Sequence, residues 1–311
     1  MRLATYIRDD AQSFGVVVRD GVADVLSLWP DGPKSVMELL RQGPKALAEV
    51  QARAAAATRL IPLDRLKLLA PIPEPSKLIG LAGNYVKHIK EFDKGKGLSD
   101  RPRADTTPRP FLMPSTAVIG SGTEIPWPAY SRQIDYEIEL AVIVGAKAKC
   151  VSPRQAIQCV AGYAIANDVS ARSVTFAQGR AARPWDEFYD WLNGKWADGF
   201  CPLGPCLVTA DEVSDVRNLN LELTVNGQLR QKANTSEMIY DVFEIVSFLS
   251  HIMTLLPGDV IATGTPAGVA MASGAWLKGG DVITCRIDGL GEMTNRLGVE
   301  PGEFYNPCAS Q

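Results

Sequence analysis

The sequence predicts an α+β protein rich in β-structure, with a small N-terminal α+β domain at residues 1–72 and a larger domain at 73–311. Short apolar runs bounded by turn residues predict most of the strands. The pair Asn226-Gly227, between runs at 219–225 and 228–232, is the strongest local hairpin signal. The segment 71–75, Pro-Ile-Pro-Glu-Pro, is stiff and extended, and it marks the domain boundary.

The first domain is expected to begin with strands at 3–7, 14–18 and 22–25, separated by Asp9-Asp10 and Arg19-Asp20-Gly21. Two helices should follow at 35–42 and 44–60, the second with an alanine-rich body. No constellation of reactive side chains occurs in this part. We therefore expect it to be a structural or dimer-supporting unit.

The larger domain should contain strands at 78–82, 134–145 and 160–166, and a last hairpin at 282–287 and 292–297. A helix is expected to begin at Val86, and 238–255 is a second segment of helical length. His251 lies in that segment among apolar residues, which is typical of a core or helix-end position.

Composition excludes several classes of protein. The net charge is -3 without a long basic run, which argues against a nucleic-acid partner. No apolar stretch reaches the length of a membrane span, and the start lacks the core of a signal peptide. The six cysteines form no CxxC pair, so we expect reduced thiols and a cytoplasmic location.

The stretch 134–145 carries the first chemical signal. Glu137 and Glu139 are two residues apart on a predicted strand and therefore point the same way. Their charges would crowd unless water or a cation lay between them. A surface strand with two solvated glutamates has the same pattern, but the continuously apolar run at 141–144 indicates that this strand enters a core.

The second predicted core strand ends in Asn167-Asp168. A third carboxylate at that point would complete an oxygen-only ligand set, which suits Mg²⁺, Mn²⁺ or Ca²⁺. The alternative for Asp168 is an N-cap or turn residue, and the spacing leaves that alternative open.

The other candidates are weaker. His88 and Glu91 lie one helical turn apart, so the carboxylate could orient the imidazole as a general base, although an exposed helix pair has the same spacing. Lys195 lies between two tryptophans, where a partly desolvated ammonium could face an anion. The loop 264–268 could hold a carboxylate on its amides and on the hydroxyl of Thr265.

Residues 92–109 are charged and rich in Gly, Pro, Asp and Thr, without periodicity. A loop of this length beside a candidate base is typical of a disordered segment or a lid. We expect it to close over the site when a ligand is bound.

Together these segments resemble the fumarylacetoacetate hydrolase superfamily, in the form of the bacterial-type proteins with this domain. The resemblance runs in order from about residue 71 to the last hairpin. It rests on the following motifs: Gly83-Asn84-Tyr85 with His88 and Glu91; Asp135-Tyr136-Glu137-Ile138-Glu139-Leu140; Asn167-Asp168-Val169-Ser170-Ala171-Arg172; Gly194-Lys195 with Asp198, Phe200, Pro202 and Gly204-Pro205; Asn234-Thr235-Ser236; and Gly264-Thr265-Pro266-Ala267-Gly268.

The resemblance implies a mixed β-roll or β-sandwich catalytic domain, usually dimeric, with Mg²⁺ or Mn²⁺ (Ca²⁺ in some crystals) held by Glu137, Glu139 and Asp168. It implies a metal-dependent hydrolase that cleaves a C–C bond in a small 2-oxo or diketo acid, such as an acylpyruvate or fumarylpyruvate. In that reaction the site residues take the following roles: His88 and Glu91 activate water, Lys195 stabilises the enolate, and Tyr85, Arg172 and Thr265 hold the substrate.

Two alternatives stay open. A lyase or isomerase of the same family, such as an oxaloacetate decarboxylase or a tautomerase or decarboxylase of 2-hydroxy-dienoates, would use the same site without an attacking water. A catalytically silent metal-binding protein would have kept the fold of the family without its activity. The sequence departs from the family at Met113, where lysine is usual, and at Ser173, Val174 and Thr175, where Asp, a hydrophobic residue and Gln are common. These changes put the identity of the substrate in doubt.

Overall fold

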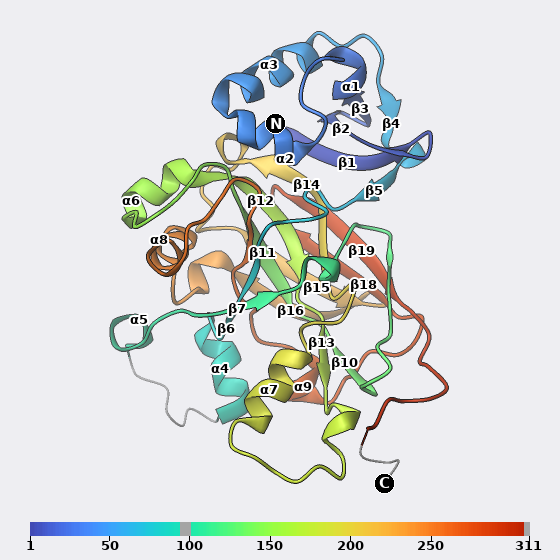
Figure 1. Cartoon of the computed structure of the whole chain (residues 1–311), viewed down its shortest axis with the longest axis vertical. Coiled ribbons are helices and arrows are strands. Elements are labelled where there is room, and N and C mark those ends of the chain that lie inside the picture. Colours follow the sequence, from blue (N-terminus) through green and yellow to red (C-terminus); the bar gives the residue numbers. More distant parts are fainter. Residues whose placement is uncertain (94–100, 308–311) are drawn as a thin grey trace.

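A computed structural model describes residues 1–93 and 101–307 of the chain (Figure 1). Within these residues the main sheet has 12 strands. In spatial order they are β4 (Ile61–Pro62), β3 (Gly21–Asp24), β2 (Ala11–Val18), β1 (Arg2–Arg8), β14 (Cys201–Thr209), β12 (Val160–Asn167), β11 (Ile138–Val144), β17 (Val260–Ala262), β6 (Leu78–Ala82) and β7 (Arg109–Met113), while β5 (Lys67–Leu69) pairs with β1 and β8 (Val118–Ile119) with β14.

Two smaller sheets complete the β-structure of the described residues. One has five strands, in the order β16 (Gln228–Asn234), β15 (Asn220–Val225), β18 (Val282–Ile287), β19 (Gly291–Leu297) and β9 (Glu124–Ile125). The other pairs β10 (Gln133–Asp135) with β13 (Ser170–Arg172). The expected β-rich α+β fold is therefore confirmed, as are both predicted hairpins.

The α-helices are short. They are α1 (Val25–Leu28), α2 (Val36–Gln42), α3 (Pro44–Ala55), α4 (Val86–Asp93), α5 (Pro102–Asp105), α6 (Pro153–Ala156), α7 (Asp186–Asn193), α8 (Val242–Ile252) and α9 (Ala270–Ser273). Single 3-10 turns occur at Leu63–Arg65, Ser115–Ala117, Ile157–Cys159, Thr175–Ala177, Ala210–Glu212 and Thr235–Glu237. In the part of the chain that the structure covers, no helix combines the length and the apolar character that crossing a membrane requires.

The predicted N-terminal strands and helices form close to their expected positions, but the sequence did not predict α1, β4 or β5, and the second predicted helix is shorter than expected. The side chain of Ser35 caps α2 by accepting the N–H of Glu38. The helix α3 ends at Ala55 instead of continuing to residue 60. The chain leaves the helix there because β4 pairs with β3 a few residues later, so sheet pairing overrides the helical propensity of the alanines.

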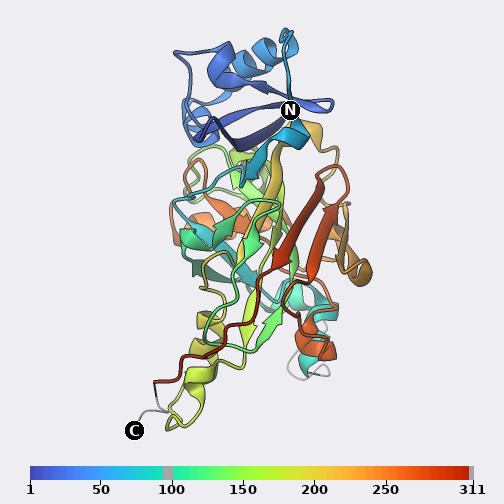
Figure 2. The ribbon, with the colours of Figure 1, turned by 90° about the vertical axis from the view of Figure 1, so that its right-hand side faces the viewer.

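The N-terminal part lies at one end of the molecule, above the larger part in Figures 1 and 2. Its strand β1 pairs antiparallel with β14, with Leu3 opposite Leu207, and so extends the sheet of the larger part. The N-terminal amine donates a hydrogen bond to Thr209 Oγ1 at 2.5 Å. The division into two domains at residue 72 stays a prediction.

The strand β11 is buried along its whole length because it separates two hydrophobic cores. One face contributes Ile138, Leu140, Val142 and Val144 to the larger core. The other contributes Ala141 and Ile143 to a core that reaches into the N-terminal part. Its apolar run was expected to enter a core, and this prediction is confirmed.

The predicted single strand at 134–145 is wrong in one detail, because Tyr136 and Glu137 interrupt it between β10 and β11. Two side chains replace the missing ladder bonds at the break. Asn167 Oδ1 accepts the N–H of Glu137 at 2.9 Å, and Gln231 Oε1 accepts the N–H of Ile138 at 3.0 Å. The break allows β10 to pair with β13 while β11 pairs with β12.

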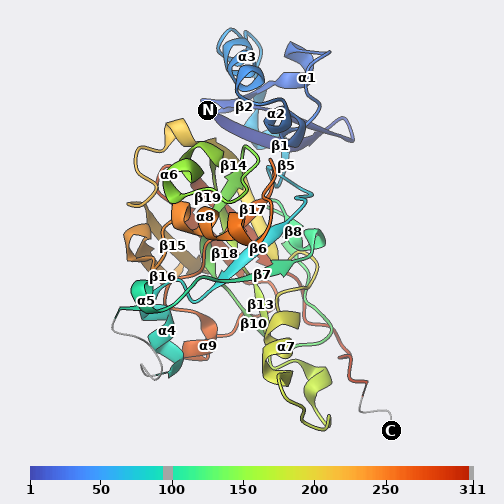
Figure 3. The ribbon, with the colours of Figure 1, turned by 60° about the vertical axis from the view of Figure 1, so that its left-hand side comes forward.

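The helices α4, α7 and α9 gather around β10 and β13 at the end of the molecule away from the N-terminal part (Figures 1 and 3). The predicted lid at 92–109 falls partly on residues 94–100, which lie outside the described residues. Its remainder includes α5, where Thr106 Oγ1 and the hydroxyl of Tyr240 share a hydrogen bond of 2.6 Å. Closure over the site stays a prediction.

Candidate active site

Three carboxylates meet where β11 begins and β12 ends. Glu139 belongs to β11, Glu137 to the break before it, and Asp168 follows β12 directly. One oxygen from each lies within 4.8 Å of the others. All three are buried: Glu137 is 5% exposed, and Glu139 and Asp168 are each 1% exposed. The structure therefore excludes two solvated glutamates on a surface strand, and Asp168 is not a simple turn residue.

Lys195 lies directly against this cluster. Its Nζ donates to Glu137 Oε2 at 2.8 Å and to Asp168 Oδ2 at 2.7 Å, and the residue is 2% exposed. The same ammonium lies 5.8 Å from the ring centres of Phe111 and Trp191. The sequence predicts a partly desolvated ammonium that faces an anion. In the structure Lys195 is fully buried, and the anions are two carboxylates of the protein itself.

Gly194 explains how Lys195 reaches the cluster. It follows the last residue of α7, and its carbonyl accepts the N–H of Ala171 in β13 at 2.8 Å. A Cβ at this position would lie 2.2 Å from the carbonyl oxygen of Ala171, so only glycine permits the close approach. The end of α7 is thereby held against β13, with the lysine pointing inward.

Arg172 is the second cation of the site. Its Nε and Nη2 both lie 3.2 Å from Asp135 Oδ2, and Nη2 also donates to Glu137 Oε1. Asp135 in turn accepts the backbone N–H groups of Ala270 and Met271, at 2.6 and 3.2 Å, where α9 begins. Arg172 is thus tied to the carboxylates, and its predicted contact with substrate stays a prediction.

The pKa values of the three carboxylates diverge because their neighbours differ. Burial alone would raise the pKa of Glu137, but the charges of Lys195 and Arg172 outweigh it and lower the pKa to about 2. Burial raises the pKa of Asp168 to about 6, since Lys195 offsets the burial only in part. Burial, with the charges of Asp168 and Glu137, raises the pKa of Glu139 well above its ordinary range.

These residues fit a divalent cation. Asp168 Oδ1 is buried and has no hydrogen-bond partner among the described residues, so a ligand position is open at the cluster. With all six side chains ionised, the carboxylates of Asp135, Glu137, Glu139 and Asp168 exceed the cations of Arg172 and Lys195 by two negative charges. An all-oxygen ligand set of this charge is what Mg²⁺ and Mn²⁺ prefer.

His88 and Glu91 form the expected pair on α4. His88 Nδ1 lies 3.1 Å from Glu91 Oε2, and both side chains are mostly buried. The ring of Phe92 packs edge-on against the imidazole, with 5.2 Å between ring centres. With the proton of the imidazole on Nδ1 and shared with Glu91, Nε2 carries the lone pair that a general base needs. This is therefore not an exposed helix pair.

The loop 264–268 does hold carboxylates, but they belong to the protein. The N–H of Gly264 donates to Glu139 Oε2 at 2.7 Å, and the N–H of Gly268 donates to Glu91 Oε1 at 2.7 Å. Both glycines have positive φ, 96° and 108°, which a residue with a side chain rarely adopts. One loop therefore positions both the carboxylate cluster and the base pair. The Thr265 hydroxyl donates to the carbonyl of Ile138 at 3.0 Å.

A cavity of ≈ 320 Å³ joins these groups. Its polar wall contains six of the nine predicted site residues: His88, Glu137, Asp168, Arg172, Lys195 and Thr265. Glu91 and Glu139 do not line the cavity. Glu91 contacts the lining residue His88, and Glu139 accepts the N–H of Gly264, the neighbour of Thr265. Tyr85 does not contribute to the cavity wall. It is 2% exposed, and its hydroxyl has no partner among the described residues.

Several supporting residues could not be assigned a role from the sequence. Asn167 and Gln231 bridge the break before β11, and Gln231 Nε2 also donates to Thr265 Oγ1 at 2.9 Å. Asn84 holds the start of α4, because its side chain bonds to the backbone of Tyr240 and Thr263. In the sequence, Asn84, Asp135 and Asn167 lie beside candidate site residues, but this position alone does not specify what each side chain does.

Comparisons with known proteins relate the chain to one family. Residues 77–298 match the family model of the fumarylacetoacetate (FAA) hydrolase C-terminal region. The mitochondrial oxaloacetate tautomerase Fahd2a of Rattus norvegicus is 36% identical over 245 residues, which is 78% of this chain and 73% of that protein.

Two solved structures share the fold. The fumarylacetoacetate hydrolase from Exiguobacterium antarcticum is 33% identical, with a TM-score of 0.80 over 96% of this chain and 100% of that one. The maleylpyruvate hydrolase from Sphingobium sp. SYK-6, solved with manganese (II) ion and pyruvate, is 32% identical, with a TM-score of 0.76 over 97% of this chain and 100% of that one. Because the match extends over most of the sequence and nearly the whole fold, this chain belongs to the fumarylacetoacetate hydrolase superfamily and is an enzyme of that family.

Proposed function

We propose that the protein is a divalent-metal-dependent hydrolase that cleaves a C–C bond in a small diketo acid of the acylpyruvate or fumarylpyruvate type. One observation carries the proposal: a base pair and a carboxylate cluster that fits a cation lie on one cavity. Glu137, Glu139 and Asp168 would hold Mg²⁺ or Mn²⁺. When bound, the cation would supply a Lewis acid for the carboxylate and enol oxygens of the substrate.

In this proposal His88 takes a proton from water at Nε2, while Glu91 fixes the ring and stabilises the imidazolium. The water oxygen bonds to the distal carbonyl carbon, and the adjacent C–C bond breaks. The electron pair remains on the departing carbon as an enolate, which receives the proton back from His88. The products are a carboxylic acid and pyruvate.

Lys195 is suited to stabilise the developing enolate oxygen. Two of its three N–H bonds are used by Glu137 and Asp168, which leaves one donor for the substrate. Burial alone would lower the pKa of Lys195, but the charges of Asp168 and Glu137 outweigh it and raise the pKa. The side chain therefore remains an ammonium, the form that stabilises an oxyanion.

A second candidate function is a tautomerase or decarboxylase acting on oxaloacetate or a 2-hydroxy-dienoate. The identity to the oxaloacetate tautomerase Fahd2a of Rattus norvegicus favours it. The same residues would serve, with His88 moving a proton on the substrate instead of activating water. The third interpretation of the sequence, a catalytically silent metal-binding protein, is not supported, because the chain belongs to a family of enzymes and keeps the base pair.

The test is a spectrophotometric assay of acetylpyruvate, fumarylpyruvate and oxaloacetate with Mg²⁺ or Mn²⁺, each with and without EDTA. Metal-dependent loss of enol absorbance, with pyruvate and a carboxylic acid formed, is the expected result. Pyruvate and CO₂ from oxaloacetate alone, or enol loss without cleavage, would replace the hydrolase with the second candidate. Absence of turnover in all three would contradict both enzymatic proposals for these substrates.

Two further expectations rest on the resemblance and stay predictions. They are the choice between Mg²⁺ and Mn²⁺ and a homodimer; a cytoplasmic location, which is expected from the cysteines, stays a prediction as well. Sedimentation of the purified protein tests the second, since a monomer at micromolar concentration would contradict it.

A further inference from the structure

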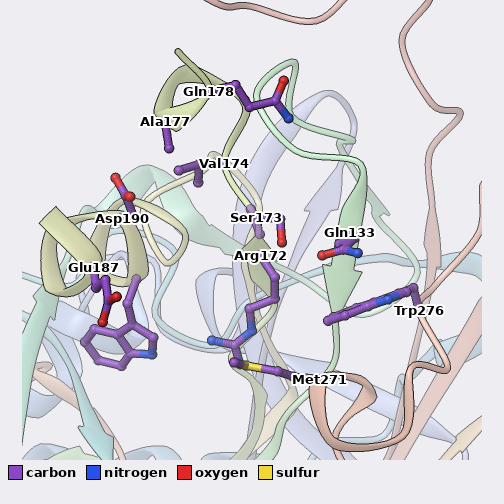
Figure 4. Close-up of a pocket in the computed structure, with 12 residues that line it drawn as sticks. Gln133, Arg172, Ser173, Val174, Ala177, Gln178, Glu187, Asp190, Met271 and Trp276 are labelled. Carbon is purple, nitrogen blue, oxygen red and sulfur yellow. The ribbon is translucent and has the colours of Figure 1, made fainter. Parts of the chain in front are cut away.

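A second cavity, of ≈ 500 Å³, adjoins the one that contains the candidate active site. The two cavities share three lining residues: Arg172, Trp191 and Met271. Figure 4 shows the Arg172 side chain extending from β13 toward Met271, so these residues stand between the two spaces. The two cavities are therefore neighbours, with the side chains of Arg172, Trp191 and Met271 at their boundary.

The wall of the second cavity is largely apolar. Val174 and Ala177 line it from the segment after β13, and Trp276 lines it from the segment after α9. Trp191 and Met271 add an indole and a flexible thioether at the junction. Aromatic and methionine side chains of this kind bind flat, apolar groups with little need for polar contacts.

The charges in the second cavity do not favour an anion. Its one cationic side chain among the described residues is Arg172, which already binds Asp135 and Glu137. Two carboxylates lie on the α7 side (Figure 4). Asp190 is paired with Arg180 at 2.8 Å, whereas Glu187 has no ion-pair or hydrogen-bond partner in the described part of the chain.

We propose that this second cavity receives the distal acyl group of the substrate, and that the preferred substrates carry a neutral, apolar or aromatic acyl group instead of a second carboxylate. The inference rests on the proposed function only in taking the first cavity as the site of the 2-oxo acid. A distal carboxylate would lose water without gaining a cation and would face Glu187. A phenyl ring would instead bury apolar area against the two tryptophans.

The test measures binding, so that it does not depend on turnover. Two 2-oxo acids without a hydrolysable diketone share their first four carbons and differ beyond them: 4-phenyl-2-oxobutanoate carries a phenyl ring and 2-oxoadipate a carboxymethyl group. Each is titrated into the Mn²⁺-loaded full chain by calorimetry. We expect the phenyl compound to bind with a Kd roughly 10-fold lower, because its ring is buried in the second cavity. Equal affinity, or tighter binding of 2-oxoadipate, would overturn the inference.

Two variants test whether this cavity sets the preference. Ala177→Trp fills it and should reduce the ratio of the two Kd values to about one. Glu187→Lys introduces a cation and should strengthen 2-oxoadipate binding by about threefold, a modest effect because the side chain is exposed. The matched control is Glu292→Lys, an equal change of charge at an exposed position on β19, which should leave the ratio unchanged. An unchanged ratio in Ala177→Trp would show that the ring binds elsewhere and would overturn the inference.

The two proposals can fail separately. Binding that follows the predicted order, without hydrolysis of any diketo acid, would contradict the hydrolase alone. Hydrolysis of diketo acids together with tighter binding of 2-oxoadipate would contradict the inference about the second cavity alone.

Discussion

Replacing Glu139 by Gln should stabilise the metal-free protein against unfolding and weaken its binding of Mn²⁺. Glu139 lies 1% exposed, with Asp168 and Glu137 close by, and burial together with their charges raises its pKa well above its ordinary range. Glutamine has nearly the same shape, and its Oε1 can still accept the N–H of Gly264. Glu139→Gln therefore removes the charge and one ligand without opening a cavity or leaving the amide unpaired.

The magnitude follows from the distances. Two like charges within 4.8 Å repel by about 3 kcal/mol or more at an effective dielectric constant of about 20. Attraction to Lys195 offsets part of this repulsion. We expect Glu139→Gln to raise the free energy of unfolding of the metal-free protein by about 1–3 kcal/mol at pH 7. Loss of one anionic ligand should weaken Mn²⁺ binding by roughly 100-fold or more.

Urea unfolding in EDTA and in excess Mn²⁺ measures both effects on one protein. The added stability from Mn²⁺ reports affinity through linkage, so it should be large in the natural sequence and small in Glu139→Gln. Glu292→Gln, at an exposed position, is the matched control and should change neither value. A variant that is less stable without metal, yet binds Mn²⁺ as tightly as the natural sequence, would refute the assignment of Glu139 to a crowded cation site.

Three further predictions concern His88, Lys195 and Asp24. His88→Ala should lower kcat on an active diketo acid by roughly 10²–10⁴-fold while Mn²⁺ affinity changes little, because His88 is the base and not a ligand; unchanged kcat would disprove that role. Lys195→Met should lower the free energy of unfolding of the metal-free protein by about 3–5 kcal/mol, because it leaves Glu137 and Asp168 without their shared cation. Excess Mn²⁺ should restore part of this loss in urea unfolding, and a variant as stable as the natural sequence in EDTA would contradict the pairing. In the N-terminal part, burial alone would raise the pKa of Asp24, but hydrogen bonds from Tyr6, Ser27 and Ser13 outweigh it and lower the pKa below 3.8. Since this pKa is lowered on folding, its stabilisation is present above pH 3.8 and is lost as the pH falls through the folded-state value. Asp24→Asn should therefore cost about 2 kcal/mol at pH 7, and the cost should shrink below pH 3.8 in acid unfolding; a cost independent of pH would contradict it.

Local signals in the sequence predict local features of the fold. The Asn226-Gly227 turn and the helix expected from residue 35 depend on neighbouring residues only. The turn occurs as expected, and the helix begins at Val36 with Ser35 as its cap. The break at Tyr136 and Glu137 could not be predicted in this way. It depends on Asn167 and on a glutamine about 90 residues further along the chain, whose side chains bond to the backbone only in the folded protein.

In the candidate site, too, features set by neighbouring residues could be predicted and features set by distant residues could not. The spacing of Glu137 and Glu139 indicates carboxylates on one side of a strand, and the structure brings Asp168 to them. The burial of Lys195 between two of these carboxylates depends on how the end of α7 packs against β13, for which the sequence carries no periodic signal. The second cavity is likewise lined by residues from β10, β13, α7 and the segment after α9, so no single sequence motif predicts it.

Isotope labelling shows whether His88 activates a water molecule beside the carboxylate cluster. An active diketo acid is turned over in H₂¹⁸O with Mn²⁺, and the acid product is examined by mass spectrometry. We expect one ¹⁸O atom in the newly formed carboxylate, at a rate that falls steeply in His88→Ala. Pyruvate released without ¹⁸O in any accompanying acid would contradict hydrolysis and indicate a lyase reaction at the same site.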